Sequence, residues 1–152
     1  MKRNDLNEII KTISQEYQYG KKLNTIEAIL KNYTGNDWKI LCKYGNKNNE
    51  QGYERILIHR CQEFEILLLC WQPGQNTQKH DHADNGCIVK ILQGSLKETL
   101  YTKKGKYVMQ LHSGDITYLD NTIGIHKVKN NTDSQAVSLH IYSPPDYKFN
   151  TF

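Results

Sequence analysis

Two histidines separated by one residue are the feature of this sequence best suited to chemistry. His80 and His82 flank Asp81, and His126 lies on a later candidate strand. Because side chains two positions apart on a strand point to the same face, both imidazoles of the pair can reach one metal ion. The third imidazole can then complete a facial triangle. We predict that His80, His82 and His126 bind one metal ion.

The predicted ligand set indicates the kind of reaction that the site can support. Three neutral imidazoles leave a divalent ion with its full positive charge and with open positions, and they do not exclude zinc or nickel. A thiol with an unperturbed pKa of about 8.5 is mostly protonated at neutral pH, whereas coordination to a dication stabilises the thiolate. The site therefore suits the binding of a thiolate.

Arginine is scarce in this lysine-rich chain and occurs only as Arg3, Arg55 and Arg60. The planar guanidinium fork binds a carboxylate through two hydrogen bonds, which lysine cannot do. Arg55 begins the first candidate strand and shares a face with Tyr53, so it is our candidate for binding a substrate carboxylate. Arg60 would face the opposite way on an unbroken strand and is the weaker candidate.

Polar residues alternate along the last candidate strand. Ser138, His140 and Tyr142 share one face, and the residues between them are apolar. A polar face that points into a barrel needs a reason. It is either a hydrogen-bonded ladder at the barrel mouth or a set of groups that serves the metal site.

The elements that must position these residues change character along the chain. Apolar residues recur at helical spacing over residues 6–17, behind the candidate caps Asn4 and Asp5, and over residues 26–33, behind Asn24 and Thr25. We predict two amphipathic helices there, then a short helix over residues 38–43 and a polar loop over residues 44–52.

The rest of the chain has the pattern of short strands separated by glycine-containing or asparagine-rich turns. The expected strands span residues 53–59, 64–71, 88–92, 96–101, 107–111, 115–119, 126–129 and 136–142. Strands at this spacing predict a barrel or sandwich.

Length and composition place these elements in one small protein. The chain has 152 residues, of which 38% are hydrophobic, which suits a single domain over residues 1–152. We expect a helical segment at residues 1–44 and a β-barrel core at residues 53–145. Four widely spaced cysteines, without a secretory signal or a long apolar run, indicate reduced thiols in a cytoplasmic protein. The net charge of +4 comes from scattered lysines, so neither nucleic acid nor membrane is an expected partner, and we expect a monomer.

The spacing Gly-x5-His-x-His-x4-Cys-x6-Gly, from Gly74 to Gly94, resembles the first motif of the cupin family, and a looser second motif runs from Gly114 to Asn130. Within cupins, the chain is similar to cysteine dioxygenases. The similarity rests on LCW at residues 69–71, HDH at 80–82, KILQGSLKET at 90–99, IGIH at 123–126 and AVSLHIYSPP at 136–145.

This resemblance implies a mostly β cupin fold, a double-stranded β-helix or jelly-roll barrel with N-terminal α-helices. It also implies an iron-dependent dioxygenase of cysteine catabolism that converts L-cysteine and O2 to cysteine sulfinate, with one Fe(II) per chain. The family's carboxylate-binding arginine lies in a Tyr-x-Arg segment like the one from Tyr53 to Arg55. A dioxygenase of another small thiol, 3-mercaptopropionate or cysteamine, and a metal-binding cupin sensor without activity are the alternatives.

The resemblance also assigns roles to the polar strand face. Tyr142 would place its phenol beside the substrate or dioxygen, and His140 and Ser138 would orient it. In family members with both residues, the cysteine and tyrosine that match Cys87 and Tyr142 form a thioether bond, so the same crosslink is expected here. Ser143-Pro144-Pro145 resembles the family's turn with a cis proline peptide.

Two features depart from other family members. The chain continues for only seven residues after Pro145, and we expect a more open pocket than in the animal enzymes. Cys87 stands where many bacterial members have glycine, which is the animal-like choice. We expect His59 and His112 to lie outside the site.

Overall fold

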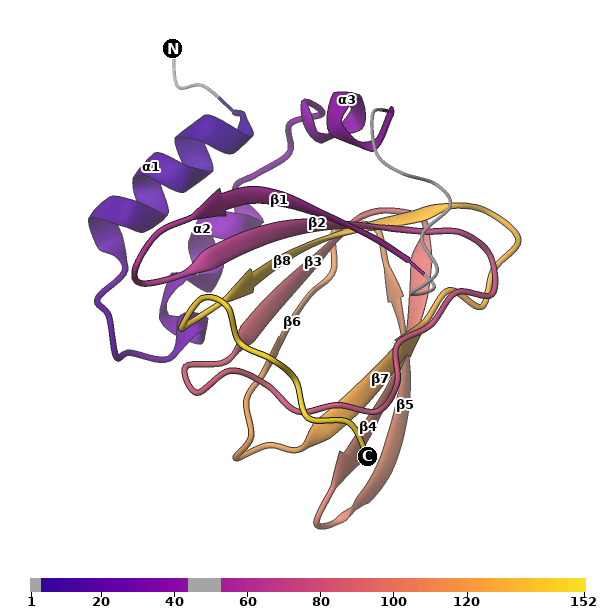
Figure 1. The fold of residues 1–152 in the computed structure, drawn as a ribbon. Helices are drawn as coiled ribbons and strands as arrows, with labels where there is room; N and C mark the ends of the chain where they lie inside the picture. Colours follow the sequence, from indigo (N-terminus) through magenta and orange to yellow (C-terminus); the bar gives the residue numbers. More distant parts are fainter. Residues whose placement is uncertain (1–3, 44–52) are drawn as a thin grey trace.

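The structure is a computed structural model that describes residues 4–43 and 53–152. Its helical elements precede all the strands (Figure 1). They are α1 (Leu6–Glu16), the 3₁₀ helix η1 (Leu23–Ile26), α2 (Glu27–Lys31) and α3 (Trp38–Lys43). The predicted loop over residues 44–52 and Arg3 lie outside the described residues. In the described part of the chain, no helix is long and apolar enough to cross a membrane.

Eight strands form two antiparallel sheets. The strands are β1 (Glu54–Arg60), β2 (Glu65–Trp71), β3 (Cys87–Gln93), β4 (Ser95–Thr102), β5 (Gly105–His112), β6 (Ile116–Leu119), β7 (Ile125–Lys129) and β8 (Ala136–Tyr142). The larger sheet has the order β1-β2-β8-β3-β6, and the smaller has the order β5-β4-β7. All eight predicted strands are confirmed, with ends that differ by at most two residues. The mostly β cupin architecture is therefore confirmed.

The larger sheet is buried on both faces. Leu68, Leu139 and Ile141 belong to a core cluster that includes the helical residues, whereas Leu67 and Leu69 belong to a second cluster shared with the smaller sheet. Figure 1 shows α1 and α2 on the side of the larger sheet that faces away from β4 and β7. Since successive side chains point to opposite faces, the unbroken apolar run of β2 supplies both clusters. The polar residues of β8 consequently face the space between the sheets.

The first helix begins where the sequence predicts, whereas the second begins at a different residue from the predicted one. Asp5 caps α1, because its side chain accepts a hydrogen bond from the Glu8 backbone N–H at 2.9 Å. The predicted caps Asn24 and Thr25 are wrong, since both lie inside η1. The preceding Lys22 donates to the Asp84 carbonyl at 2.7 Å. This tertiary contact holds the chain against the barrel and explains the different start.

Local backbone geometry brings β7 close to β4. A Cβ atom on Gly124 would lie 2.3 Å from the Tyr101 carbonyl oxygen, so only glycine permits this approach just before His126. The pairing of β4 with β7 then places His126 opposite Leu100. The peptide bond between Ser143 and Pro144 is cis, as the family turn predicted.

Candidate active site

The three predicted ligand histidines meet in the structure. His80 and His82 lie in the segment between β2 and β3, which is not a regular strand, and His126 lies on β7. His80 and His126 exchange backbone hydrogen bonds at 2.9 and 3.1 Å. One nitrogen from each of the three imidazoles lies within 4.8 Å of the others. Two segments 46 residues apart therefore form one potential metal site.

The hydrogen bonds of the imidazoles indicate where their lone pairs point. Nδ1 of His80 lies 2.8 Å from the Gln78 carbonyl, and Nδ1 of His126 lies 3.0 Å from the Glu98 carboxylate. Both partners are acceptors, so we assign the ring protons to Nδ1 and the lone pairs to Nε2. The two Nε2 atoms face each other at 3.1 Å, an arrangement that a cation between them would relieve.

His82 supplies the remaining evidence that a cation fits. Both of its ring nitrogens are buried, and they are the only such side-chain nitrogen or oxygen atoms without a hydrogen-bond partner in the described residues. Burial and the two neighbouring imidazoles lower the pKa of His82 to about 3. Burial also lowers the pKa of His80 and of His126. All three rings are therefore neutral near pH 7, which is the form that binds metals.

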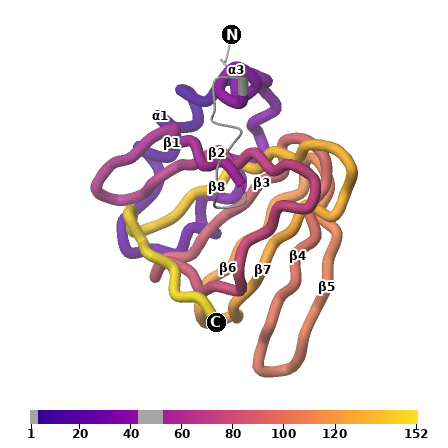
Figure 2. The backbone as a smooth tube through the Cα atoms, turned by 45° about the vertical axis from the view of Figure 1, so that its right-hand side comes forward, coloured from indigo at the N-terminus to yellow at the C-terminus, as the bar shows by residue number. Residues whose placement is uncertain are grey.

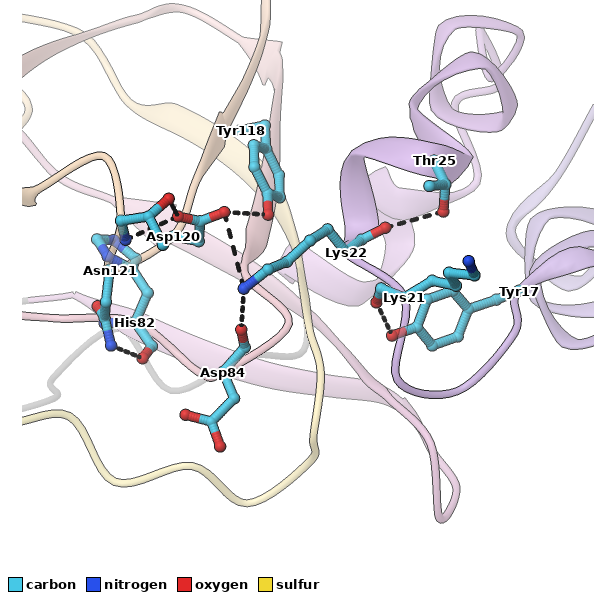
Figure 3. Close-up of polar contacts among 10 residues, drawn as sticks. Tyr17, Lys21, Lys22, Thr25, His82, Asp84, Tyr118, Asp120 and Asn121 are labelled. Atoms are coloured by element: carbon cyan, nitrogen blue, oxygen red, sulfur yellow. Dashed lines mark hydrogen bonds and ion pairs between the residues drawn. The ribbon is translucent and has the colours of Figure 1, made fainter.

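The side chain of Asn121 holds the backbone of His82 in place (Figure 3). Its Oδ1 accepts from the His82 backbone N–H at 2.9 Å, and its Nδ2 donates to the His82 carbonyl at 2.9 Å. Beside it, Asp120 accepts from the Tyr118 hydroxyl at 2.6 Å and pairs with Lys22 at 4.0 Å. The loop after β6 thus adds to the contacts with β7 that hold this segment.

Glu98 is a functional candidate that sequence reasoning missed. It lies on β4, is 2% exposed, and accepts the hydrogen bond from His126 Nδ1. A carboxylate in this position orients a ligand imidazole and increases its basicity. The signal was in the sequence, because Glu98 interrupts the inward apolar positions Leu96 and Leu100 of a strand with period-two alternation.

Polar groups of the larger sheet form the opposite wall of the site. Trp71 Nε1 donates to Ser138 Oγ at 2.9 Å, and Ser138 Oγ lies 2.7 Å from His140 Nε2. Tyr142 follows on the same face, and the pairing of β3 with β8 places it directly opposite Cys87. Burial raises the pKa of the Tyr142 phenol and of the Cys87 thiol, so both hold their protons at neutral pH.

The two arginine candidates differ in their surroundings. Arg55 pairs with Leu69 across β1 and β2, which places it on the face that looks toward the smaller sheet. The Arg55 side chain is exposed, and its guanidinium carbon lies 6.0 Å from the ring centroid of Phe149, which lines the cavity. Burial and then the charge of Arg55 lower the pKa of His140. Arg60 instead forms an ion pair with Asp146. Tyr53 lines the cavity and stacks on Trp71, with ring centroids 4.4 Å apart.

The segment after β8 closes the site rather than leaving it open. Figures 1 and 2 show it running from the end of β8 past the segment between β2 and β3 toward β7. Phe149 packs on His80 and on Tyr142, with ring centroids 4.9 and 5.4 Å apart. The expectation of a more open pocket than in the animal enzymes stays a prediction. His59 and His112 lie outside the histidine group, as expected.

Comparison with known proteins agrees with this geometry. The family model described as "Cysteine dioxygenase type I" matches residues 3–152. The chain belongs to the cysteine dioxygenase type I family. Cysteine dioxygenase type 1 of Danio rerio is 32% identical over 168 residues, which cover 100% of this chain and 81% of the relative.

Solved structures show the shared fold. A double-stranded β-helix protein of Klebsiella pneumoniae has a TM-score of 0.60 at 17% identity and covers 73% of this chain and 92% of its own. A cupin domain of Bordetella pertussis has a TM-score of 0.50 at 20% identity, with coverages of 62% and 96%. Membership of the cysteine dioxygenase family and the three-histidine group together indicate a bound metal ion and small-molecule substrates.

Proposed function

We propose that this protein is an iron-dependent cysteine dioxygenase that converts L-cysteine and O2 to cysteine sulfinate. The observation that carries the proposal is the convergence of three neutral imidazoles beside a buried tyrosine, with an arginine on the same face of the larger sheet. A site that only holds a metal needs the imidazoles alone. The family to which the chain belongs supports the same activity.

His80, His82 and His126 would hold one Fe(II) per chain. Bound there, the ion would supply a positive charge that stabilises the substrate thiolate, together with the capacity to react with dioxygen. Glu98 would keep the proton of His126 on Nδ1, which leaves Nε2 free as the ligand atom. Asn121 would keep His82 within reach of the same point.

Arg55 would bind the carboxylate of cysteine. Its guanidinium can form two parallel charge-assisted hydrogen bonds with a carboxylate, which fixes the orientation of the substrate. Tyr53, stacked on Trp71, forms a rigid wall next to it. Arg60 is less suited to this role because Asp146 already neutralises it.

Tyr142 would act as a proton-bearing hydroxyl beside the reacting sulfur. The chain from Trp71 through Ser138 to His140 fixes the imidazole next to it, and the ring centroids of His140 and Tyr142 lie 6.2 Å apart. Cys87 and Tyr142 face each other across neighbouring strands, where direct neighbours have Cβ atoms about 5 Å apart. A thioether between them would lock the phenol in place.

Oxygen uptake by the iron-loaded protein tests this function directly. With L-cysteine we expect uptake of one O2 for each sulfinate formed, and slower uptake with 3-mercaptopropionate or cysteamine. The first of these lacks the ammonium group and the second lacks the carboxylate. A faster reaction with either would reassign the substrate. Absence of uptake with all three thiols in the fully loaded protein would leave a metal-binding cupin sensor as the function.

The surroundings of the reaction follow from the same proposal. We infer that the protein works as a cytoplasmic monomer on small molecules, without nucleic acid or membrane as partners. The scattered lysines argue against a nucleic-acid partner. Size-exclusion chromatography with light scattering would test the monomer.

A further inference from the structure

Phe149 lies between the two groups that would bind the ends of the substrate. Its ring centroid is 4.9 Å from that of His80, and the Arg55 guanidinium carbon lies 6.0 Å from the ring centroid. The Tyr142 ring packs against Phe149 on a third side, with the two ring centroids 5.4 Å apart. A thiol whose sulfur reaches the metal ligands and whose carboxylate reaches Arg55 must cross the space that this ring occupies.

The same ring separates two hollows of very different size. The inner cavity, lined by the three histidines, Cys87 and Tyr142, has a volume of about 20 Å³. The outer hollow has a volume of about 500 Å³. Four residues line both: Tyr53, Thr77, His80 and Phe149. The inner volume holds about one water molecule, so cysteine does not fit while Phe149 keeps this position.

A few hydrogen bonds hold the segment that carries Phe149. Asn150 donates from its backbone N–H and from Nδ2 to the two carboxylate oxygens of Asp81, at 2.8 and 2.7 Å. Asp81 N–H donates to the Asn150 carbonyl at 3.1 Å, and Phe152 N–H donates to the Lys79 carbonyl at 3.0 Å. The segment is thus attached mainly to residues 79–81, and breaking this short set of contacts would free it to move.

We propose that Phe149 is a gate that controls which thiols reach the metal. The ring leaves its position when residues 147–152 lift from residues 79–81, and the outer hollow then opens into the inner cavity. A carboxylate binds Arg55 more strongly than an aromatic face does. A thiol with a carboxylate can therefore displace the Phe149 ring from Arg55. A thiol without a carboxylate forms no such interaction with Arg55, so it does not favour the displaced position of the ring. The inference rests on the proposed function, since it takes thiols as the substrates.

Thiol binding without turnover tests the gate. The protein is loaded with Co(II), kept free of oxygen and mixed rapidly with cysteine or cysteamine, and the thiolate-to-cobalt absorption band reports the association rate. We expect Phe149→Ala to raise the rate for cysteamine by about tenfold, equivalent to about 1.4 kcal/mol, and to raise that for cysteine less. Asn150→Ala should raise both rates, because it loosens the segment and keeps the ring. Phe152→Ala, on the same segment with a 69% exposed side chain, is the matched control.

Hydrogen exchange provides a second readout that does not depend on the metal. The amides of Asn150 and Phe152 should exchange faster than those of β8 in the metal-free protein, and faster still in Asn150→Ala. Cobalt content measured for every variant shows whether the metal site has stayed intact.

Three results would overturn the gate: unchanged association rates in Phe149→Ala with full cobalt content, equal effects of Phe152→Ala, or no thiolate band in any variant. Failure of the proposed function has a different signature, because cysteine would still bind to the cobalt protein while the iron-loaded protein consumed no oxygen.

Discussion

The three ligand imidazoles differ in their hydrogen-bond partners. A backbone carbonyl fixes the ring of His80 and a carboxylate fixes the ring of His126, whereas the ring nitrogens of His82 have no hydrogen-bond partner within the described residues. The first two rings keep their protons on Nδ1, so the three together offer lone pairs to one point. Three buried, neutral imidazoles whose lone pairs point to one place form a site that a cation would fill.

Removing any one imidazole should therefore release the metal. We expect alanine at position 80, 82 or 126 to lose most of the iron and nearly all of the activity, because two neutral ligands hold a divalent ion weakly. Elemental analysis of purified protein measures the loss. His112→Ala is the control, since its exposed imidazole lies outside the group. Full iron retention in all three ligand variants would refute the site.

Arg55 should determine preference for carboxylate-bearing thiols. We expect Arg55→Lys to lower kcat/KM for cysteine by an amount on the order of 2 kcal/mol or more, because lysine cannot form the bidentate pair. Cysteamine has no carboxylate, so its kcat/KM should change little. Arg60→Lys is the matched control and should leave both values unaltered. Equal losses for both thiols in Arg55→Lys would indicate a folding defect instead.

Cys87 and Tyr142 should become covalently joined during turnover. Formation of the sulfur–carbon bond removes the thiol hydrogen and one ring hydrogen, and dioxygen takes up the two electrons. Peptide mass spectrometry after incubation with iron, cysteine and oxygen should show a linked pair lacking two hydrogens. Cys87→Ser should abolish the link and keep measurable activity, whereas Tyr142→Phe should lower activity further because the hydroxyl is lost. A folded, iron-loaded Cys87→Ser protein without any activity would contradict this account.

At the scale of elements, the candidate ligands come from one strand and one connecting segment. His126 belongs to a regular strand, but His80 and His82 belong to a connecting segment that is held by β7, by the loop after β6 and by residues 150–152. The position of the metal site thus depends on loop contacts as much as on the barrel.

Asn121 provides a direct test of that dependence. Asn121→Ala removes both hydrogen bonds to the His82 backbone and should weaken metal binding by about 10- to 100-fold, as loss of a supporting partner typically does. Competition with a chelator measures the metal dissociation constant. Asn131→Ala removes hydrogen bonds to Gln110 on the exposed side of the barrel and should leave the metal dissociation constant unchanged. Equal dissociation constants for wild type and Asn121→Ala would mean that the strand pairing alone holds His82.

At the scale of the whole molecule, helices and barrel share a core. The apolar faces of α1 and α2 pack with the outer residues of β2 and β8 in a single cluster. Lys90 of β3, 6% exposed, donates from Nζ to the carbonyls of Leu30 and Tyr33 at 2.7 and 2.5 Å. We infer that both parts unfold together as one domain.

Denaturant titration tests this inference through two probes. Helical circular dichroism and tryptophan fluorescence should report the same midpoint. Lys90→Met should lower both midpoints together, by about 1–3 kcal/mol in the free energy of unfolding, because two buried carbonyls lose their partner. Lys129→Met, at an exposed position of β7, should have little effect. Separate transitions for the two probes would show that the helices form an independent unit.

The sequence by itself determined the strands and the chemistry of the ligands. Alternating or unbroken apolar runs between turn residues mark the eight strands, and the close spacing of His80 and His82 indicates two candidate ligands locally. The polar face of β8 follows from the same periodicity and depends only on neighbours in the chain. The position of Cys87 opposite Tyr142 instead depends on the pairing of β3 with β8, and the sequence indicated it only through the family resemblance.

Only the tertiary structure decided which distant groups meet. Glu98 reaches His126 because β4 pairs with β7, Asn121 reaches His82 across 39 residues, and η1 begins where Lys22 meets the barrel. Residues 147–152 carry no periodic signal, yet they place Phe149 over the metal ligands through contacts with Asp81. Such contacts form only when both sheets have packed together. They join residues that are far apart in the sequence, so no local sequence pattern predicts them.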